Sequence, residues 1–153
     1  MNRTASLLAV SRRLPQGGGL ARTLLARAPF VALRWEVRCR SRFDALDSGG
    51  RRLGVFLPRG TVLRGGDVLV AQDGSLVAVR AAPEPVLTVR ADPARGTAFD
   101  LLRAAYHLGN RHVQLELAPD HLKLEPDHVL AEMLRGMGLE VRAEEAAFEP
   151  EAG

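Results

Sequence analysis

The spacing of apolar residues changes once along this chain, near residues 91–96, and this change limits the folds open to it. Upstream, short apolar runs are separated by turn residues, as in β-strands, whereas downstream apolar residues recur at helical spacing. The segment ADPARG between them holds Pro and Gly and little to bury, which is typical of a linker. We therefore predict an α+β protein with a small β-rich domain over 1–92 and a second domain over 97–153.

The run VALRWEVRCR alternates strictly between apolar and polar residues, which predicts a strand over 31–40 with one buried face. Cys39 would lie on that face with its thiol covered. Further strands are predicted in RRLGVFLP, DVLVA, LVAVRAA and PVLTVRA, with turns at 47–50, 64–67 and Asp73-Gly74. The first 90 residues thus predict a small all-β domain.

The downstream region opens with a helix in TAFDLLRAAYHLG. Thr97 is the expected N-cap and Asp100 follows three residues later, close to a capping box. Phe99, Leu102 and Tyr106 share a helical spacing. Gly109 is the natural residue to end the helix, because it accepts the left-handed conformation.

Two short strands joined at Pro119-Asp120 follow this helix, and then a second helix ends at Gly138. Its N-cap is either Glu125, with Pro126 at the first position, or Asp127. A last strand lies in LEVRAEEAAFEP. With a strand such as VLTVR in front, the order becomes the β-α-β-β-α-β pattern of a ferredoxin-like domain.

The composition excludes several classes of protein. With 46% hydrophobic and 25% charged residues the chain should fold, and no apolar run approaches the roughly 20 residues that span a bilayer. A single cysteine excludes an intramolecular disulfide, a zinc site of cysteine pairs and a CxxC redox pair. The first 35 residues lack acids, as a mitochondrial transit peptide does, but PQGGGL interrupts any amphipathic helix there. We expect a cytoplasmic protein without a membrane partner.

The charge is unevenly distributed. Residues 1–96 carry 16 Arg and 7 acids, a balance of +9, whereas residues 97–153 carry 5 basic residues and 11 acids, a balance of −6. Such halves are typical of domains with different surface partners. A basic, β-rich half also suits a nucleic-acid-binding module. Against that alternative, Trp35 and Tyr106 are the only Trp and Tyr, and the arginines alternate with apolar positions instead of flanking a stacking platform.

All four histidines lie within 22 residues, and imidazole is the commonest metal-binding side chain near neutral pH. None forms a strong motif such as HExxH. His107 suits the negative end of a helix dipole, and His121 beside Asp120 suits a solvated turn. His128, in the first turn of the second helix, fits a structural and a metal-binding role equally.

His112 stands out because Asn110 and Arg111 precede it at the joint between a helix and a strand. One histidine cannot hold a divalent ion alone, but an isologous dimer contact would place two copies at one axis. Imidazole with oxygen ligands suits Ni(II), Cu(II) and Zn(II). A hydrolase using His112 as a general base is the other chemical option, but neither a nucleophile partner nor a phosphate loop is visible, so we do not expect an enzyme.

The stretch AYHLGNRHVQLEL, with the motif GNRH at Gly109, Asn110, Arg111 and His112, resembles the urease accessory nickel chaperones called UreE. The segments SRFDALDSGGRRLGVFLPRGTVLRGGDVL, DHVLAEMLRGMGLEV and FEPEAG resemble the same family, so that the likeness covers roughly residues 8–153.

The resemblance implies a peptide-binding-like β domain, a ferredoxin-like metal-binding domain, and a homodimer formed through the latter. His112 would be the nickel ligand shared by two subunits, with His107, His121 or water completing the shell. His107 and His128 match weaker peripheral sites of some members. The implied partners are the accessory GTPase and the urease apoprotein with its other accessory proteins.

Two departures limit these implications. Pro126 stands where some members have a histidine, which weakens a site at His128. This sequence shows no histidine-rich tail after FEPEAG. We therefore expect about one Ni(II) per dimer, with Zn(II) or Cu(II) able to bind the same site.

Overall fold

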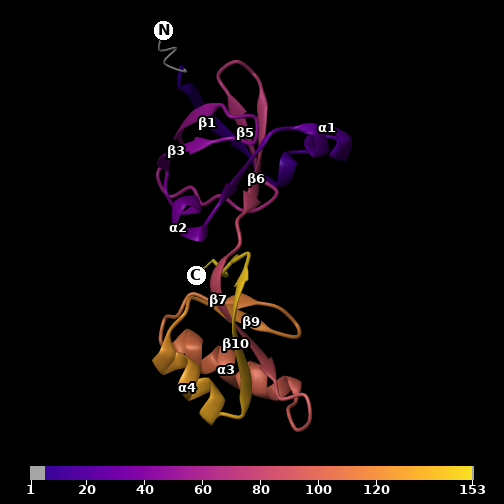
Figure 1. The fold of residues 1–153 in the computed structure, drawn as a ribbon, viewed down its shortest axis with the longest axis vertical. Coiled ribbons are helices and arrows are strands. Elements are labelled where there is room, and N and C mark those ends of the chain that lie inside the picture. Colours follow the sequence, from indigo (N-terminus) through magenta and orange to yellow (C-terminus); the bar gives the residue numbers. More distant parts are fainter. Residues whose placement is uncertain (1–5, 153) are drawn as a thin grey trace. The chain divides into compact units, whose positions relative to one another are not determined.

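The computed structural model describes residues 6–152 (Figure 1). Residues 1–5, part of the stretch compared with a transit peptide, and Gly153, the end of FEPEAG, lie outside the described residues. Internal contacts divide the chain after Ala82 into two compact units. The predicted linker at 91–96 is therefore wrong: it contains the end of a strand of the second unit and the loop that follows. Its Pro and Gly mark a turn between elements of one unit.

The first unit is built on a six-stranded sheet with the order β2-β6-β5-β1-β4-β3. β1 pairs in parallel with β4 and antiparallel with β5, and β2 pairs in parallel with β6. Short helical segments interrupt it, so this unit is sheet-rich but not purely β. The elements are β1 (Leu8–Leu14), η1 (Pro15–Gly17), α1 (Arg22–Arg27), β2 (Phe30–Leu33), α2 (Trp35–Arg38), β3 (Arg42–Leu46), β4 (Arg52–Phe56), β5 (Val68–Ala71) and β6 (Leu76–Ala81).

The strand predicted over 31–40 stops at Leu33, and a helical turn, α2, replaces its second half. Arg38, predicted on the solvent face, is fully buried: its Nε donates to the Leu33 carbonyl at 3.0 Å, and its guanidinium lies 5.2 Å from the centre of the Trp35 ring. Cys39, predicted in the core, is exposed. The prediction from the alternating pattern is wrong because the buried contacts of Arg38 outweigh the local preference for a strand.

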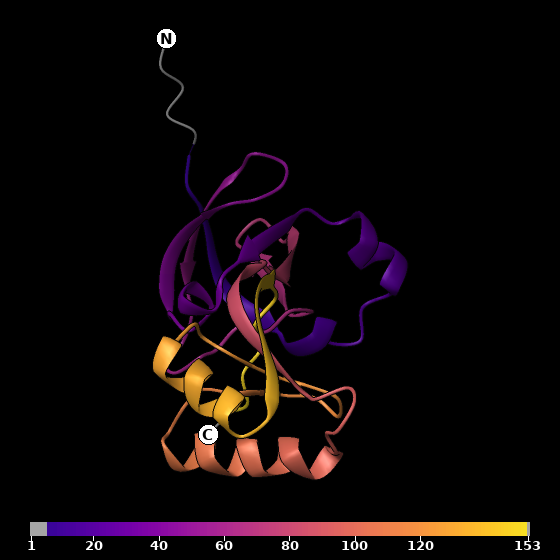
Figure 2. The same cartoon turned by 60° about the horizontal axis from the view of Figure 1, so that its bottom comes forward.

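The second unit follows the predicted β-α-β-β-α-β order, with four antiparallel strands in the order β10-β7-β9-β8. The helices α3 and α4 lie on the same side of this sheet (Figure 2). Leu87 and Val89 of β7 share one core cluster with residues of both helices. The ferredoxin-like element order is thus confirmed. The elements are β7 (Glu84–Ala91), α3 (Ala98–Asn110), β8 (Glu116–Leu117), β9 (Leu122–Leu124), α4 (His128–Gly136) and β10 (Leu139–Ala146).

α3 begins as predicted, since the Asp100 carboxylate accepts the backbone N–H of the N-cap Thr97 at 2.9 Å. Its buried face differs from the prediction. Leu101, Ala104 and Leu108 pack into the core, whereas the predicted apolar set Phe99, Leu102 and Tyr106 is exposed. α3 therefore carries two apolar faces, and only one of them is covered within its own unit.

α4 resolves the choice between two N-caps in favour of Asp127. The Asp127 carboxylate accepts the N–H groups of Val129 and Leu130 at 2.9 and 3.0 Å, so that His128 is the first helical residue. Gly138, with φ at +85°, follows the C-cap and ends the helix as predicted.

Candidate functional site

The loop after α3 holds His112 in an uncommon backbone conformation. Arg111 is the C-cap, and His112 has φ at +59°, in the left-handed region. The His112 N–H donates to the Gly109 carbonyl at 3.0 Å, and the Val113 N–H donates to the Leu108 carbonyl at 3.1 Å. These paired bonds are those of a Schellman motif.

The prediction that Gly109 supplies the left-handed residue is therefore wrong. Gly109 lies inside α3, and the helix runs past it to Asn110. His112 takes the position that glycine usually fills, although it carries a Cβ atom. Among the described residues only one other non-glycine, Gln16, has a positive φ. Such conformations cluster at functional sites, where surrounding contacts hold the residue in place.

His112 is exposed and lines a hollow of about 490 Å³ in the second unit. The Schellman motif places His112 directly after the end of α3. Residues 113–115, which follow it, line the hollow and precede β8. The lining is mostly apolar with three polar side chains, and it consists of Ala105, Gly109, His112, Val113, Gln114, Leu115, Leu117 and Glu151. This is an open site in which a nitrogen ligand and a carboxylate share one concave surface.

The two motif residues before His112, Asn110 and Arg111, lie beside this site. Asn110 and Arg111 are exposed, and within the described residues neither side chain makes a hydrogen bond or an ion pair. The turn is closed by backbone N–H groups alone. Both side chains are thus available to solvent at the rim of the loop.

Two family models match consecutive parts of the chain. The model for the N-terminal domain of the urease accessory protein UreE matches residues 10–82, and the model for its C-terminal domain matches residues 84–153. The chain belongs to the UreE family. The boundary between the two matches coincides with the division of the structure after Ala82.

Named relatives agree with this assignment. A urease accessory protein UreE of Albidiferax ferrireducens is 66% identical over 147 residues, which cover 96% of this chain and 84% of the relative. Those of Methylibium petroleiphilum and Burkholderia ambifaria are 66% and 52% identical, covering 68% and 69% of the relatives and 96% and 94% of this chain. Membership of the UreE family supports a role in urease maturation, and these names describe accessory proteins, not catalysts.

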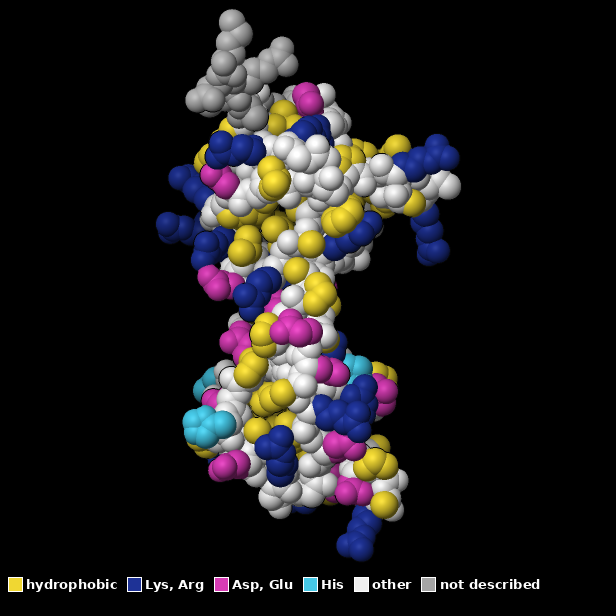
Figure 3. Space-filling view, in the orientation of Figure 1, with side chains coloured by type: hydrophobic (Ala, Val, Ile, Leu, Met, Phe, Trp, Pro, Cys, Tyr) yellow, Lys and Arg dark blue, Asp and Glu magenta, His cyan; other side chains and the backbone are white. Residues whose placement is uncertain are grey.

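The other histidines of this UreE-family chain do not line the His112 hollow. His107 is exposed on α3, where its ring makes an edge contact with Tyr106 at 5.3 Å between centroids. His128 is exposed at the start of α4. The histidines visible in Figure 3 all lie on the second unit. Proximity in sequence thus did not bring the four side chains to one site.

His121 belongs to a separate polar network. Its Nδ1 lies 2.7 Å from the Asp120 carboxylate, and its Nε2 lies 3.8 Å from Glu116, which also pairs with Lys123 at 3.0 Å. The hydrogen bond with His121 lowers the pKa of Asp120, and burial acts in the opposite direction without reversing the shift. These contacts leave His121 with little freedom to turn toward an ion elsewhere.

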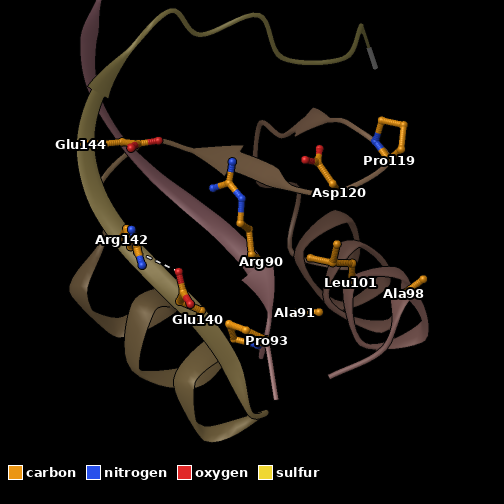
Figure 4. A pocket seen from close by; sticks show the side chains of 10 residues that line it. All are labelled: Arg90, Ala91, Pro93, Ala98, Leu101, Pro119, Asp120, Glu140, Arg142 and Glu144. Atoms are coloured by element: carbon orange, nitrogen blue, oxygen red, sulfur yellow. Dashed lines mark ion pairs between the residues drawn. The ribbon is translucent and has the colours of Figure 1, made fainter. Parts of the chain in front are cut away.

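A second hollow, of about 660 Å³, is lined by residues of β7 and β10, by the first turn of α3 and by the Pro119-Asp120 turn (Figure 4). Arg90 of β7 reaches into it between Glu144 of β10 and Asp120. The acids already have partners: Glu140 pairs with Arg142 at 2.7 Å, and Glu144 accepts a hydrogen bond from Thr88. This hollow contains neither a histidine nor a cysteine, so it is a poorer candidate for metal binding.

Within the described residues, no three His, Cys, Asp or Glu side chains converge on a point where one subunit could hold an ion. No helix in this part of the chain is long and apolar enough to cross a membrane. Sequence reasoning singled out His112 but not Glu151, which lines the same hollow, because nothing local marks Glu151. Its place in the hollow depends on how the C-terminal segment folds back on the unit.

Proposed function

We propose that this chain carries Ni(II) to the urease apoprotein, and that the ion binds at the axis of a homodimer between two copies of His112. The observation that carries the proposal is the strained, exposed placement of His112 in a hollow at the end of α3. Two backbone hydrogen bonds hold the turn that carries His112, and a ligand on such a restrained turn loses little conformational freedom when it binds an ion. Family membership supplies the link to urease maturation.

The uncovered face of α3 supports the dimer. Phe99, Leu102 and Tyr106 are 62%, 65% and 69% exposed and follow one another at helical spacing. Large apolar side chains grouped on a surface commonly mark a contact with another protein. α3 leads directly to His112, so a two-fold contact through this face would bring both imidazoles toward one axis.

An open site suits a carrier, because a receiving protein must add its ligands before the carrier withdraws its own. Imidazole and oxygen ligands accept Ni(II), and Zn(II) or Cu(II) would compete for the same place. We expect about one ion per dimer at the paired His112 site. His107 and His128 remain available for weaker peripheral binding, whereas the bonds of His121 to Asp120 favour a structural role.

The accessory GTPase and the urease apoprotein with its other accessory proteins are the proposed partners, in the cytoplasm. The first unit offers a surface for an acidic partner, because most arginines of the chain lie in it. Arg111, exposed beside the site, is placed to reach an acidic group of a docking protein.

Calorimetric titration of Ni(II) into the wild-type protein and two variants tests the proposal. We expect His112→Ala to weaken binding at the tightest site by at least about tenfold, roughly 1.4 kcal/mol. His107→Ala is the matched control, since His107 lies on α3 outside the hollow, and it should leave that site unchanged. Nickel binding by His112→Ala as tight as that of the parent would overturn the proposal.

A further inference from the structure

The segment after β10 is fixed on the second unit by bonds to the β8–β9 hairpin. Phe148 is fully buried, and the Glu149 N–H donates to the Glu116 carboxylate at 2.7 Å. Lys123 donates to the Ala147 carbonyl at 3.1 Å. The Glu151 N–H donates to the Leu115 carbonyl at 2.9 Å. The backbone of this segment is therefore held both before and at residue 151.

This docking brings a carboxylate into the hollow that His112 lines. Leu115, which accepts the Glu151 N–H, lies three residues after His112 and lines the same hollow. Glu151 is the one acidic side chain that lines the hollow, and His112 is the one histidine. Glu149, two residues earlier, does not line it. His112 and Glu151, 39 positions apart in sequence, thus line one concave surface. The hydrogen bond from the Glu151 N–H to the Leu115 carbonyl sets which residue of the C-terminal segment reaches it.

We propose that Glu151 is a second ligand for the ion held by His112, an inference that rests on the proposed carrier function. In a two-fold dimer, two imidazole nitrogens and two carboxylates would surround one divalent ion, and the two negative charges would balance its charge. Mixed nitrogen and oxygen ligands suit Ni(II), and water can fill the remaining positions. Glu151 thereby replaces His107 and His121 as the residue that completes the shell.

The electrostatics of the site favour Glu151 over Gln114, the other polar side chain of the hollow. A carboxylate attracts a divalent cation through its full charge, whereas an amide oxygen offers only a dipole. Within the described residues the Glu151 carboxylate makes no ion pair, whereas Glu116 pairs with Lys123 and Glu140 pairs with Arg142.

The test compares Glu151→Gln with the matched control Glu149→Gln, in the full chain. Both changes remove one negative charge from the same segment and keep the backbone N–H groups that dock it. We expect Glu151→Gln to weaken Ni(II) binding by about tenfold, and the Glu149→Gln protein to bind like the parent. The visible spectrum of bound Co(II), used as a probe ion, should change in Glu151→Gln alone because a ligand is lost.

The outcomes separate this inference from the carrier proposal. If Glu151→Gln binds Ni(II) and Co(II) as the parent does, while His112→Ala loses binding, the role of Glu151 is overturned and the carrier proposal stands. If the His112→Ala protein also binds Ni(II) as the parent does, both the Glu151 inference and the carrier proposal are overturned. Equal weakening by Glu151→Gln and Glu149→Gln would show a general charge effect and would likewise overturn the assignment of Glu151 as a ligand.

Discussion

His112 occupies a backbone position that costs free energy. A residue with a Cβ atom in the left-handed conformation is about 1 kcal/mol less stable there than in the right-handed one, whereas glycine is almost free of this penalty. The protein keeps an imidazole at this position, held by the two backbone bonds of the Schellman motif. Since an imidazole at this position lowers stability relative to glycine, its presence is consistent with a function of the ring other than stabilising the fold.

Replacement of His112 by glycine and by alanine should separate stability from binding. We expect His112→Gly to be as stable as the parent or more stable, by up to about 1 kcal/mol, because it removes the Cβ penalty. The His112→Ala protein keeps that penalty and should not gain stability. Urea denaturation with a chelator present measures both, and a His112→Gly protein less stable than His112→Ala would contradict the account. Both variants should lose the tightest nickel site.

Residue types predicted part of this site. The pattern GNRH located the turn and the imidazole, but it favoured Gly109 as the left-handed residue. The helix continues past Gly109 because Leu108 is buried in the core and its carbonyl is then satisfied by Val113. The position of Glu151 was not predictable locally, since it depends on a bond to Leu115.

At the scale of elements, the N-cap of α3 and the end of α4 were predicted correctly because cap chemistry is local, whereas the end of α3 was placed wrongly at Gly109. The side chains of Thr97 and Asp127 cap the starts of α3 and α4, and Gly138 ends α4 because it accepts a positive φ. The faces of elements were predicted less well. α3 has apolar residues on most of its circumference, so spacing alone could not show which set is buried, and the run over 31–40 changes from strand to helix at a buried arginine.

The N-cap of α4 gives a prediction at this scale. Asp127→Ala removes the acceptor of two N–H bonds, and we expect it to lower the free energy of unfolding by about 1 kcal/mol. Glu125→Ala is the control, since Glu125 is exposed just outside the helix and was the alternative cap. Thermal or urea denaturation of both variants measures the difference. Equal effects of the two changes would count against the assigned cap.

At the scale of the whole molecule, the two units differ in charge, the first being basic and the second acidic. The nucleic-acid-binding alternative loses support, because Trp35 is buried between Arg38 and Arg64 and cannot stack on a base. The division into a β-rich and a ferredoxin-like part was predictable from periodicity. Its position was not, because β7 resembles the strands of the first unit in sequence and joins the second sheet only through its pairing with β9 and β10.

Oligomeric state tests the role of the uncovered face of α3. Leu102→Glu places a charge at the centre of that face, and burying it unpaired in a dimer contact would be costly. We expect its dimer dissociation constant to rise at least about tenfold in sedimentation equilibrium. Leu24→Glu is the control, since Leu24 is 49% exposed on α1 of the first unit. An unchanged dimer in Leu102→Glu would exclude this face as the contact.

The docking of the C-terminal segment has a practical consequence for work with the purified protein. Residues attached after Glu151 leave the fold at the rim of the hollow that His112 lines. A polyhistidine purification tag at that end would hold its imidazoles there at an effective concentration of about a millimolar. It would then compete with the His112 site for added Ni(II), so an untagged or N-terminally tagged chain is the appropriate material for the metal titrations.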